Sequence, residues 1–164
     1  MKNTISEPYR ITEKDWSKFK DFIIRSRTDI PYAYGDGLEK VMQQPDLYWI
    51  EGIKNKQVFV IDNEEKFVSG VVLSKDDDGI WSIKSLWTEP TYRGKGLALK
   101  LLDCVIDTAK KSGVKVIELG VNIKLKAAIT LYKSIGFKEI ERLNDIDMGD
   151  GSKNNLLIMR LELE

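Results

Sequence analysis

The chain of 164 residues contains no histidine. Ser-His-Asp and Cys-His nucleophile systems and histidine-containing zinc sites are therefore excluded, because each of them needs an imidazole. Any catalysis by this chain must use carboxylates, tyrosine, lysine, backbone amides or a bound cofactor.

Cysteine is almost absent as well, since Cys104 is the only one. It can form neither an internal disulfide nor a cysteine-cluster metal site, which favours a reduced, cytoplasmic setting. We expect Cys104 to be structural, because it lies at the edge of the apolar face of its helix. The polar stretch Met1–Arg10 lacks the apolar core of a signal peptide, and no apolar run is long enough to cross a bilayer. A cytoplasmic protein with no membrane partner is the expectation.

Neither sign of charge is in excess, because 26 lysines and arginines balance 26 aspartates and glutamates. This balance argues against a nucleic-acid partner, since neutralising phosphates requires a surplus of basic residues. Hydrophobic residues make up 42% of the chain, which is enough for a core. Length and composition predict a single domain over residues 1–164.

Helical and strand periodicities alternate along the chain and predict a mixed α/β fold. The predicted strands are Pro8–Ile11, Val58–Ile61, Val68–Leu73, Ile80–Trp87, Val114–Val121, Phe137–Arg142 and Leu156–Leu163. The predicted helices are Thr12–Arg27, Leu38–Gln44, Asp46–Lys54, Gly96–Lys111 and Lys124–Ile135, and Asn144–Asn155 is expected to be a polar loop. The second, third and fourth strands should form an antiparallel meander, and a parallel strand-helix-strand unit should follow it.

The segment Thr88–Ala98 (TEPTYRGKGLA) lies between a predicted strand and a long helix. Gly94 and Gly96 can expose backbone N–H groups without an obstructing Cβ, and the helix adds unpaired N–H groups and the positive end of its dipole. With Arg93 and Lys95, the segment could form a pyrophosphate cradle. The alternative is an ordinary glycine-containing turn that carries two solvated bases.

Known phosphate loops fit this segment poorly. The Walker pattern requires Ser or Thr after Gly-Lys, and the dinucleotide fingerprint requires a third glycine where Leu99 stands. The acidic residue at a suitable distance, Glu118, lies in the middle of a predicted strand. A nucleotide-binding oxidoreductase is therefore disfavoured.

The pattern R-x-x-G-x-A does fit, as Arg93–Ala98, and with the preceding Leu86–Tyr92 it resembles the fourth strand and pyrophosphate loop of the GNAT superfamily of N-acetyltransferases. Ala128–Phe137 resembles the second signature of that superfamily, in the expected order and spacing. The resemblance spans about Gln57 to Leu161. It implies a mixed, twisted sheet of six to seven strands flanked by about four helices.

The resemblance also implies acetyl-CoA as the co-substrate and a reaction that needs no metal ion. The implied cofactor-binding residues are Leu86, Trp87, Thr88, Arg93, Gly94, Lys95, Gly96, Leu97 and Ala98. Many relatives add an asparagine at the position of Leu125; here Asn122 could substitute for it.

By the same resemblance, Tyr132 would be the general acid that protonates the departing thiolate. The alternative is a packing tyrosine on an amphipathic helix. Tyr32 and Tyr34 lie where GNAT proteins often contact the acceptor, although loop aromatics also often simply pack. The predicted fourth strand contains no carboxylate, and Glu89 just after it is expected on the loop surface, so we expect water or a remote carboxylate to act as the base. Asp76–Asp78 is interpreted as a solvated hairpin turn.

The resulting hypothesis is an N-acetyltransferase that moves an acetyl group from acetyl-CoA to a primary amine by direct attack in a ternary complex. The acceptor would be a small amine or a protein amine, and paired strand edges could produce a homodimer. The alternative is a non-catalytic module that binds acyl-CoA as a sensor.

Overall fold

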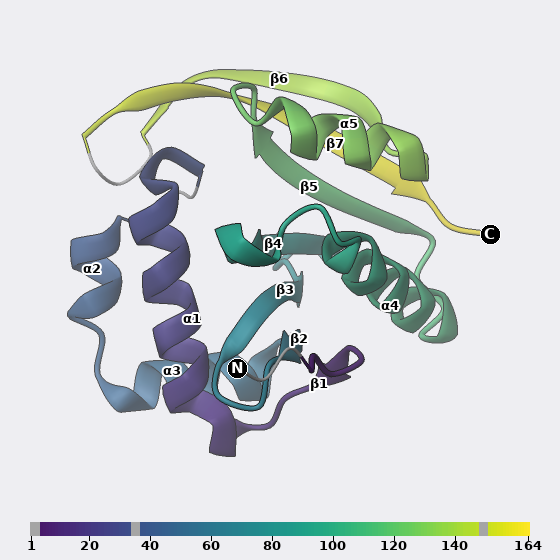
Figure 1. Cartoon of the computed structure of the whole chain (residues 1–164). Helices are drawn as coiled ribbons and strands as arrows, with labels where there is room; N and C mark the ends of the chain where they lie inside the picture. The colour runs from purple at the N-terminus through teal and green to yellow at the C-terminus, as the bar shows by residue number, and fades with distance from the viewer. Residues whose placement is uncertain (1–3, 34–36, 148–150) are drawn as a thin grey trace.

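The computed structural model describes residues 4–33, 37–147 and 151–164, and within them it forms one seven-stranded sheet with helices on both faces (Figure 1). The strands are β1 (Tyr9–Arg10), β2 (Gln57–Asp62), β3 (Phe67–Lys75), β4 (Trp81–Thr88), β5 (Val116–Asn122), β6 (Lys138–Asp147) and β7 (Lys153–Glu162). The α-helices are α1 (Trp16–Asp29), α2 (Leu38–Met42), α3 (Asp46–Asn55), α4 (Leu97–Lys111) and α5 (Lys126–Ile135). Short 3₁₀ turns cover Glu13–Asp15, Pro31–Ala33 and Pro90–Tyr92.

The strand order is β1-β2-β3-β4-β5-β7-β6. Neighbouring strands are antiparallel except β4 and β5, which are parallel and are connected through α4. The predicted meander and the predicted parallel unit are both confirmed. A mixed seven-stranded sheet agrees with the expected six to seven strands, and the described residues contain five α-helices where about four were expected.

The sheet separates two hydrophobic cores, and the alternation along β2 shows how. Val58 and Val60 face the core that also contains side chains of α1 and α3. Phe59 and Ile61 point the other way, into the core covered by α4 and α5. Both faces of β2 are buried, because side chains alternate along a strand and helices cover both sides.

The C-terminal hairpin differs from the prediction. Asn144–Asn155 was expected to be a loop, but β6 continues to Asp147 and β7 begins at Lys153, with Ile146 opposite Asn154. For residues 144–147 and 153–155 that prediction was wrong, because β6 is an edge strand whose side chains are mostly exposed; residues 148–150 of the predicted loop lie outside the described residues. Polar residues fit such a strand, so the apolar pattern does not reveal it. Within the part of the chain that the structure describes, no helix is both long and apolar enough to span a membrane.

Candidate active site between strands β4 and β5

The two parallel strands β4 and β5 are paired along only part of their length. The pairs are Trp81–Ile117, Ser82–Glu118 and Ile83–Leu119, and the register records no further pair beyond them. Figure 1 shows the two strands diverging past this point. Backbone groups of the second half of β4 and of β5 are therefore left facing one another without a shared ladder between the two strands.

A β-bulge in β4 explains the divergence. Gly70 pairs with Trp87 and Val72 pairs with Lys84, so Ser85 and Leu86 together stand opposite one residue of β3. Ser85 has a φ of 56°, in the left-handed region that non-glycine residues rarely adopt. A bulge bends its strand and increases the local twist, and here it turns β4 away from β5 immediately after their last pair.

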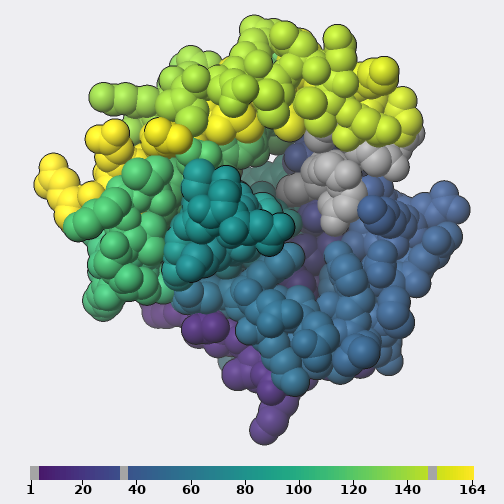
Figure 2. Space-filling model, turned by 180° about the vertical axis from the view of Figure 1, so that it is seen from behind, coloured from purple at the N-terminus to yellow at the C-terminus, as the bar shows by residue number. Residues whose placement is uncertain are grey.

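A cavity of about 640 Å³ occupies this split. On one side it is lined by β5, by Ala128 and Tyr132 on one face of α5, and by Leu125 just before that helix. On the other side it extends beneath α1 and α3, where Ile23 and Trp49 line it. Figure 2 shows a hollow between the C-terminal strands and the segments from the middle of the chain. The cavity thus reaches structural elements on both faces of the sheet.

The predicted pyrophosphate loop lies between β4 and α4. Gly94 and Gly96 both have a φ of 77°, and Lys95 between them does not share the positive φ. Backbone N–H groups converge in such an alternation, which is typical of anion-binding concavities. A Cβ added at either glycine would meet nothing within 4 Å, so the space beside the loop is open. Helix α4 starts at Leu97, and its first N–H groups have no carbonyl one turn earlier to bind.

The side chains of this loop are more constrained than the sequence indicated. Arg93 donates from Nε to the Thr88 carbonyl at 2.9 Å and forms an ion pair with Asp29, the last residue of α1. The same carboxylate accepts a hydrogen bond of 2.9 Å from Trp87 Nε1. Lys95 Nζ lies 5.3 Å from the centre of the Tyr92 ring. Arg93 therefore fixes the loop to α1 and β4.

Tyr132 lies in the cavity wall and is 7% exposed. Gly136 ends α5 in the left-handed conformation, and the Phe137 N–H donates to the Tyr132 carbonyl at 3.0 Å. The rings of Tyr132 and Phe137 pack edge to face, with centroids 5.8 Å apart. The second sequence signature therefore builds a helix end that holds the Tyr132 ring against the cavity.

The side chain of Asn122, which was predicted to contact the cofactor, has hydrogen-bond partners inside the protein. Its side chain is fully buried; Nδ2 donates to the Tyr32 carbonyl at 3.0 Å, and Oδ1 accepts from the Lys124 N–H at 2.9 Å. Both polar ends are thus used inside the protein, and Asn122 fastens the Pro31–Ala33 turn to the end of β5. Tyr32 stacks with Lys124, whose Nζ is 5.4 Å from the ring centre, whereas Tyr34 lies outside the described residues.

Glu89 is also not the surface residue that the sequence predicted. Its side chain is 15% exposed and accepts from Lys66 at 2.7 Å and from Arg25 at 3.1 Å. Burial alone raises the pKa of this carboxyl, but the hydrogen bond and charge of Lys66, a hydrogen bond from Thr91 and the charge of Arg25 outweigh it and lower the pKa overall. Glu89 therefore stays ionised within its ion pairs, which makes it a poor general base.

Two other sequence predictions concern groups outside the split. Cys104 is partly buried, and burial followed by the charge of Asp107 raises the pKa of its thiol, so the reactive thiolate is disfavoured. Asp76 begins the predicted hairpin turn, where its N–H donates to the Ile80 carbonyl at 2.7 Å. Within the described part of the chain, no three His, Cys, Asp or Glu side chains are grouped so as to hold a metal ion.

Sequence reasoning missed the charged residues of the cavity wall. Arg27, Lys56 and Lys84 line the cavity, together with the carboxylates Asp76 and Glu118. One signal was available for Arg27, because it continues the helical stripe of Phe19 and Ile23 at a spacing of four. A charged residue on an apolar stripe needs a specific reason to be buried.

Solved structures share the fold of nearly the whole chain. The Salmonella typhimurium protein YncA, solved with its cofactor acetyl-CoA, has a TM-score of 0.79. The alignment covers 99% of this chain and 95% of that one at 20% sequence identity, so the likeness concerns the fold. The fold of this chain is thus similar to that of a protein solved with acetyl-CoA bound.

The chain belongs to the acetyltransferase (GNAT) family, whose model matches residues 16–137. The L-methionine sulfoximine/L-methionine sulfone acetyltransferase of Salmonella typhimurium is 32% identical over 80 residues, which are 49% of this chain and 47% of that protein. The ribosomal protein bS18-alanine N-acetyltransferase of Escherichia coli is 38% identical over 76 residues, which are 46% of this chain and 51% of that protein. The chain thus spans about half the length of these curated relatives.

Proposed function

We propose that this chain transfers an acetyl group from acetyl-CoA to a primary amine by direct attack in a ternary complex. The observation that carries the proposal is the split between β4 and β5, which opens onto a cavity reaching both faces of the sheet. Cofactor and acceptor could enter such a passage from opposite sides. Family membership and the two relatives above, which are named for acetylating amino-acid derivatives and a protein alanine, support an amine acceptor.

The residues beside the split fit acetyl-CoA. The open space at Gly94 and Gly96 and the first amides of α4, at Leu97 and Ala98, suit the pyrophosphate. Backbone groups of Leu86 and Thr88, in the half of β4 that has left β5, suit the pantetheine and the thioester carbonyl. Acetyl-CoA itself supplies an activated acetyl thioester.

Groups of the protein would assist two steps of the reaction. A backbone N–H of β4 directed at the thioester oxygen would stabilise the developing oxyanion, and removing such a donor typically costs about 3 kcal/mol of barrier. Tyr132 would protonate the departing thiolate. A thiol with a pKa near 8.5 and a tyrosine with a pKa near 10 make that transfer uphill by roughly 2 kcal/mol, which a proton passed on from the new ammonium could offset.

The general base remains assigned to water or to a remote carboxylate. The strand β4 contains no acidic residue, and the Glu89 carboxylate forms ion pairs with Lys66 and Arg25. Because the chain has no histidine and the thiolate of Cys104 is disfavoured, neither residue type is expected to accept the acetyl group. A stable acetyl label recovered on the protein would contradict direct attack.

The first test is a thermal-shift titration with acetyl-CoA, free CoA and NADH. A ligand at 100 times its Kd stabilises the folded state by about 2.7 kcal/mol, which corresponds to roughly 5–11 °C in Tm for a chain of this size. We expect such a shift with acetyl-CoA and none with NADH, followed by thiol release when an amine is added. If millimolar acetyl-CoA produces no shift, the proposal is wrong.

The second candidate function is a sensor that binds acyl-CoA without turnover. The observation that favours it is the acid-free β4, together with Leu125 where many relatives have a polar contact. Acetyl-CoA binding with no thiol release on any amine would support the sensor. The homodimer, the single domain over 1–164 and the cytoplasmic location remain predictions.

A further inference from the structure

One glycine stands in the middle of a regular strand, in the wall of the cavity. Gly120 belongs to β5, and the pairing of β5 with β7 runs from Val116–Glu162 to Asn122–Leu156 without a register shift. Glycine in the interior of a strand weakens it, because its backbone loses more conformational freedom on folding and no side chain packs. A bulge, a close backbone or a closely bound ligand often accounts for such a residue. The unbroken register excludes a bulge in this pairing.

Nothing in the free protein requires glycine at this position. The φ of Gly120 is not positive, so a residue with a side chain can adopt its backbone conformation. Among the residues that the structure describes, a Cβ added at Gly120 would meet only Ile158 Cδ1, at 3.5 Å, which is ordinary van der Waals contact. Gly120 is exposed, and it lines the cavity together with Ile158. A small side chain would therefore fit here, and glycine instead leaves open space at the cavity wall.

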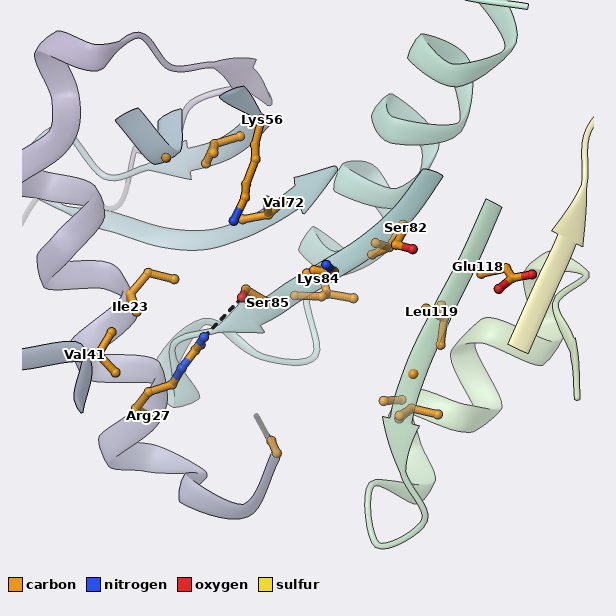
Figure 3. Close-up of a pocket in the computed structure, with 18 of the residues that line it drawn as sticks. Ile23, Arg27, Val41, Lys56, Val72, Ser82, Lys84, Ser85, Glu118 and Leu119 are labelled. Atoms are coloured by element: carbon orange, nitrogen blue, oxygen red, sulfur yellow. Dashed lines mark hydrogen bonds between the residues drawn. The ribbon is translucent and has the colours of Figure 1, made fainter. Parts of the chain in front are cut away.

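Gly120 lies at the point where the two parallel strands separate. The last recorded pair between them joins Ile83 to Leu119, so Gly120 is the first residue of β5 beyond their shared ladder. On the other side of the opening, β4 carries the bulge at Ser85 and then Leu86. Figure 3 shows the end of β4, with Ser85, lying apart from β5, with Leu119. The space at Gly120 is therefore across the opening from the backbone proposed to hold the thioester.

This space opens on the face of the sheet that carries α1. Leu119 and Val121, the neighbours of Gly120 in the strand, belong to the core covered by α4 and α5. Because side chains alternate along a strand, a Cβ at Gly120 would point to the opposite face. Two residues further on, the Asn122 side chain binds the carbonyl of Tyr32, in the turn that follows α1. The proposed pyrophosphate site lies at the start of α4, so the space at Gly120 faces the side left for the acceptor.

We propose that Gly120 determines acceptor specificity, because its missing side chain makes room for a branch on the carbon that bears the amine. This inference rests on the proposed function and specifies the substrate class as primary amines on a branched carbon. Since the space lies across from the thioester, the atoms that reach it are those next to the reacting nitrogen. An unbranched amine would leave the space unfilled and lose contacts with the strand and with Ile158. A branch would fill it and would orient the amine for attack.

The first test compares isomeric amines that differ only in branching. 1-Aminopentane, 1-aminohexane and 1-aminoheptane are each assayed by thiol release against each enantiomer of the 2-amino isomer. The isomers have the same composition and similar basicity, but branching hinders the nitrogen, so the linear isomer reacts faster where no binding preference exists. One carbon placed in an apolar pocket changes kcat/KM by about 10- to 200-fold, so we expect the branched isomer to be at least about 3-fold better in one or more pairs. Equal or faster reaction of the linear isomer in every pair would overturn the inference.

Two glycine variants then assign the preference to this position. Gly120→Ala places a methyl group in the proposed space, whereas Gly52→Ala adds one elsewhere on the cavity wall, in α3, where a Cβ meets nothing within 4 Å. We expect Gly120→Ala to lower kcat/KM by about 10- to 200-fold for the branched isomer and by less than about 3-fold for the linear one. Gly52→Ala should leave the ratio of the two isomers unchanged. Equal losses for both isomers in Gly120→Ala, or the same change of ratio in Gly52→Ala, would overturn the inference.

Stability and cofactor binding separate acceptor specificity from a structural role. Both variants should keep or raise the Tm, because alanine replaces glycine inside a strand or a helix without a clash. The Kd for acetyl-CoA should not change. A Gly120→Ala variant that loses stability or acetyl-CoA affinity together with activity would overturn the assignment. A wild type that acetylates other primary amines but neither isomer of any pair would overturn this inference alone, whereas one that releases no thiol with any amine would refute the proposed function itself.

Discussion

The two glycines that flank helix α4 allow a direct test of the cofactor loop. Gly96 precedes the helix and Gly113 follows it. Both have a φ of 77°, and a Cβ added at either position meets nothing within 4 Å. Substitution by alanine therefore creates no clash at either end and costs only the left-handed backbone conformation, about 1–2 kcal/mol. At roughly 2–4 °C per kcal/mol, both variants should lose about 2–8 °C in Tm.

The two variants should differ in their affinity for acetyl-CoA. At Gly96 the new methyl group occupies the open space beside the amides proposed to hold the pyrophosphate. Gly113 lies one helix length away, and 15 residues correspond to about 22 Å. We expect Gly96→Ala to raise the Kd for acetyl-CoA at least 10-fold and Gly113→Ala to leave it unchanged.

Urea unfolding would measure the stability change, and calorimetric titration below both transitions would measure the Kd. The same Kd for both variants would refute the placement of the pyrophosphate at this loop. A stability loss at only one of the two positions would refute the argument from backbone strain.

Three further predictions concern packing, catalysis and pH. Gly70→Ala should destabilise the protein by about 1–3 kcal/mol in urea unfolding, because the new Cβ would lie 2.8 Å from Phe22 Cζ. Its control is Gly52→Ala in helix α3, where a new Cβ meets nothing within 4 Å and the protein should gain roughly 0.5–1 kcal/mol of stability. Tyr132→Phe should lower kcat for acetyl transfer by about 10²–10⁴-fold with little change in the Kd for acetyl-CoA, and an unchanged kcat would assign the ring to packing. Glu89→Gln should cost stability at pH 7, since the pKa of this carboxyl is lowered in the folded state. That difference should shrink as the pH falls below the ordinary value of 4.5 and vanish below the lowered folded-state pKa; a difference that stays constant down to pH 2 would contradict the ion-pair assignment.

Local patterns predicted most of the fold because they record burial. Strand β2 alternates between two apolar cores, and α4 repeats its apolar residues on one face, so both could be recognised from periodicity. The full length of the edge strand β6 could not be recognised from periodicity, because its exposed side chains carry no apolar repeat. Gly94 and Gly96 were identified correctly as positions that need freedom at φ, because glycine itself is the signal.

The site was only partly predictable, because its decisive features depend on pairs of residues far apart in the chain. The bulge that opens the split occurs at Ser85, a residue type that does not predict a positive φ. Asn122 and Glu89 looked available from their position at strand ends. The Asn122 amide donates to the carbonyl of Tyr32, and the Glu89 carboxylate pairs with Arg25. These partners are distant in the sequence, so only the folded structure identifies them.

The last turn of α1 connects the two halves of the proposed site. Arg27 projects from it toward the bulge at Ser85, and two residues later the Asp29 carboxylate accepts from the Trp87 indole and pairs with Arg93 of the glycine loop. The same helix end thus contacts both the bulge beside the cavity and the glycine loop. Direct attack needs the amine within about 3–3.5 Å of the thioester carbon, and a shared support restricts the motion of one binding half against the other. This arrangement suits the proposed ternary complex, because one helix end contacts both the bulge that opens the cavity and the proposed cofactor loop.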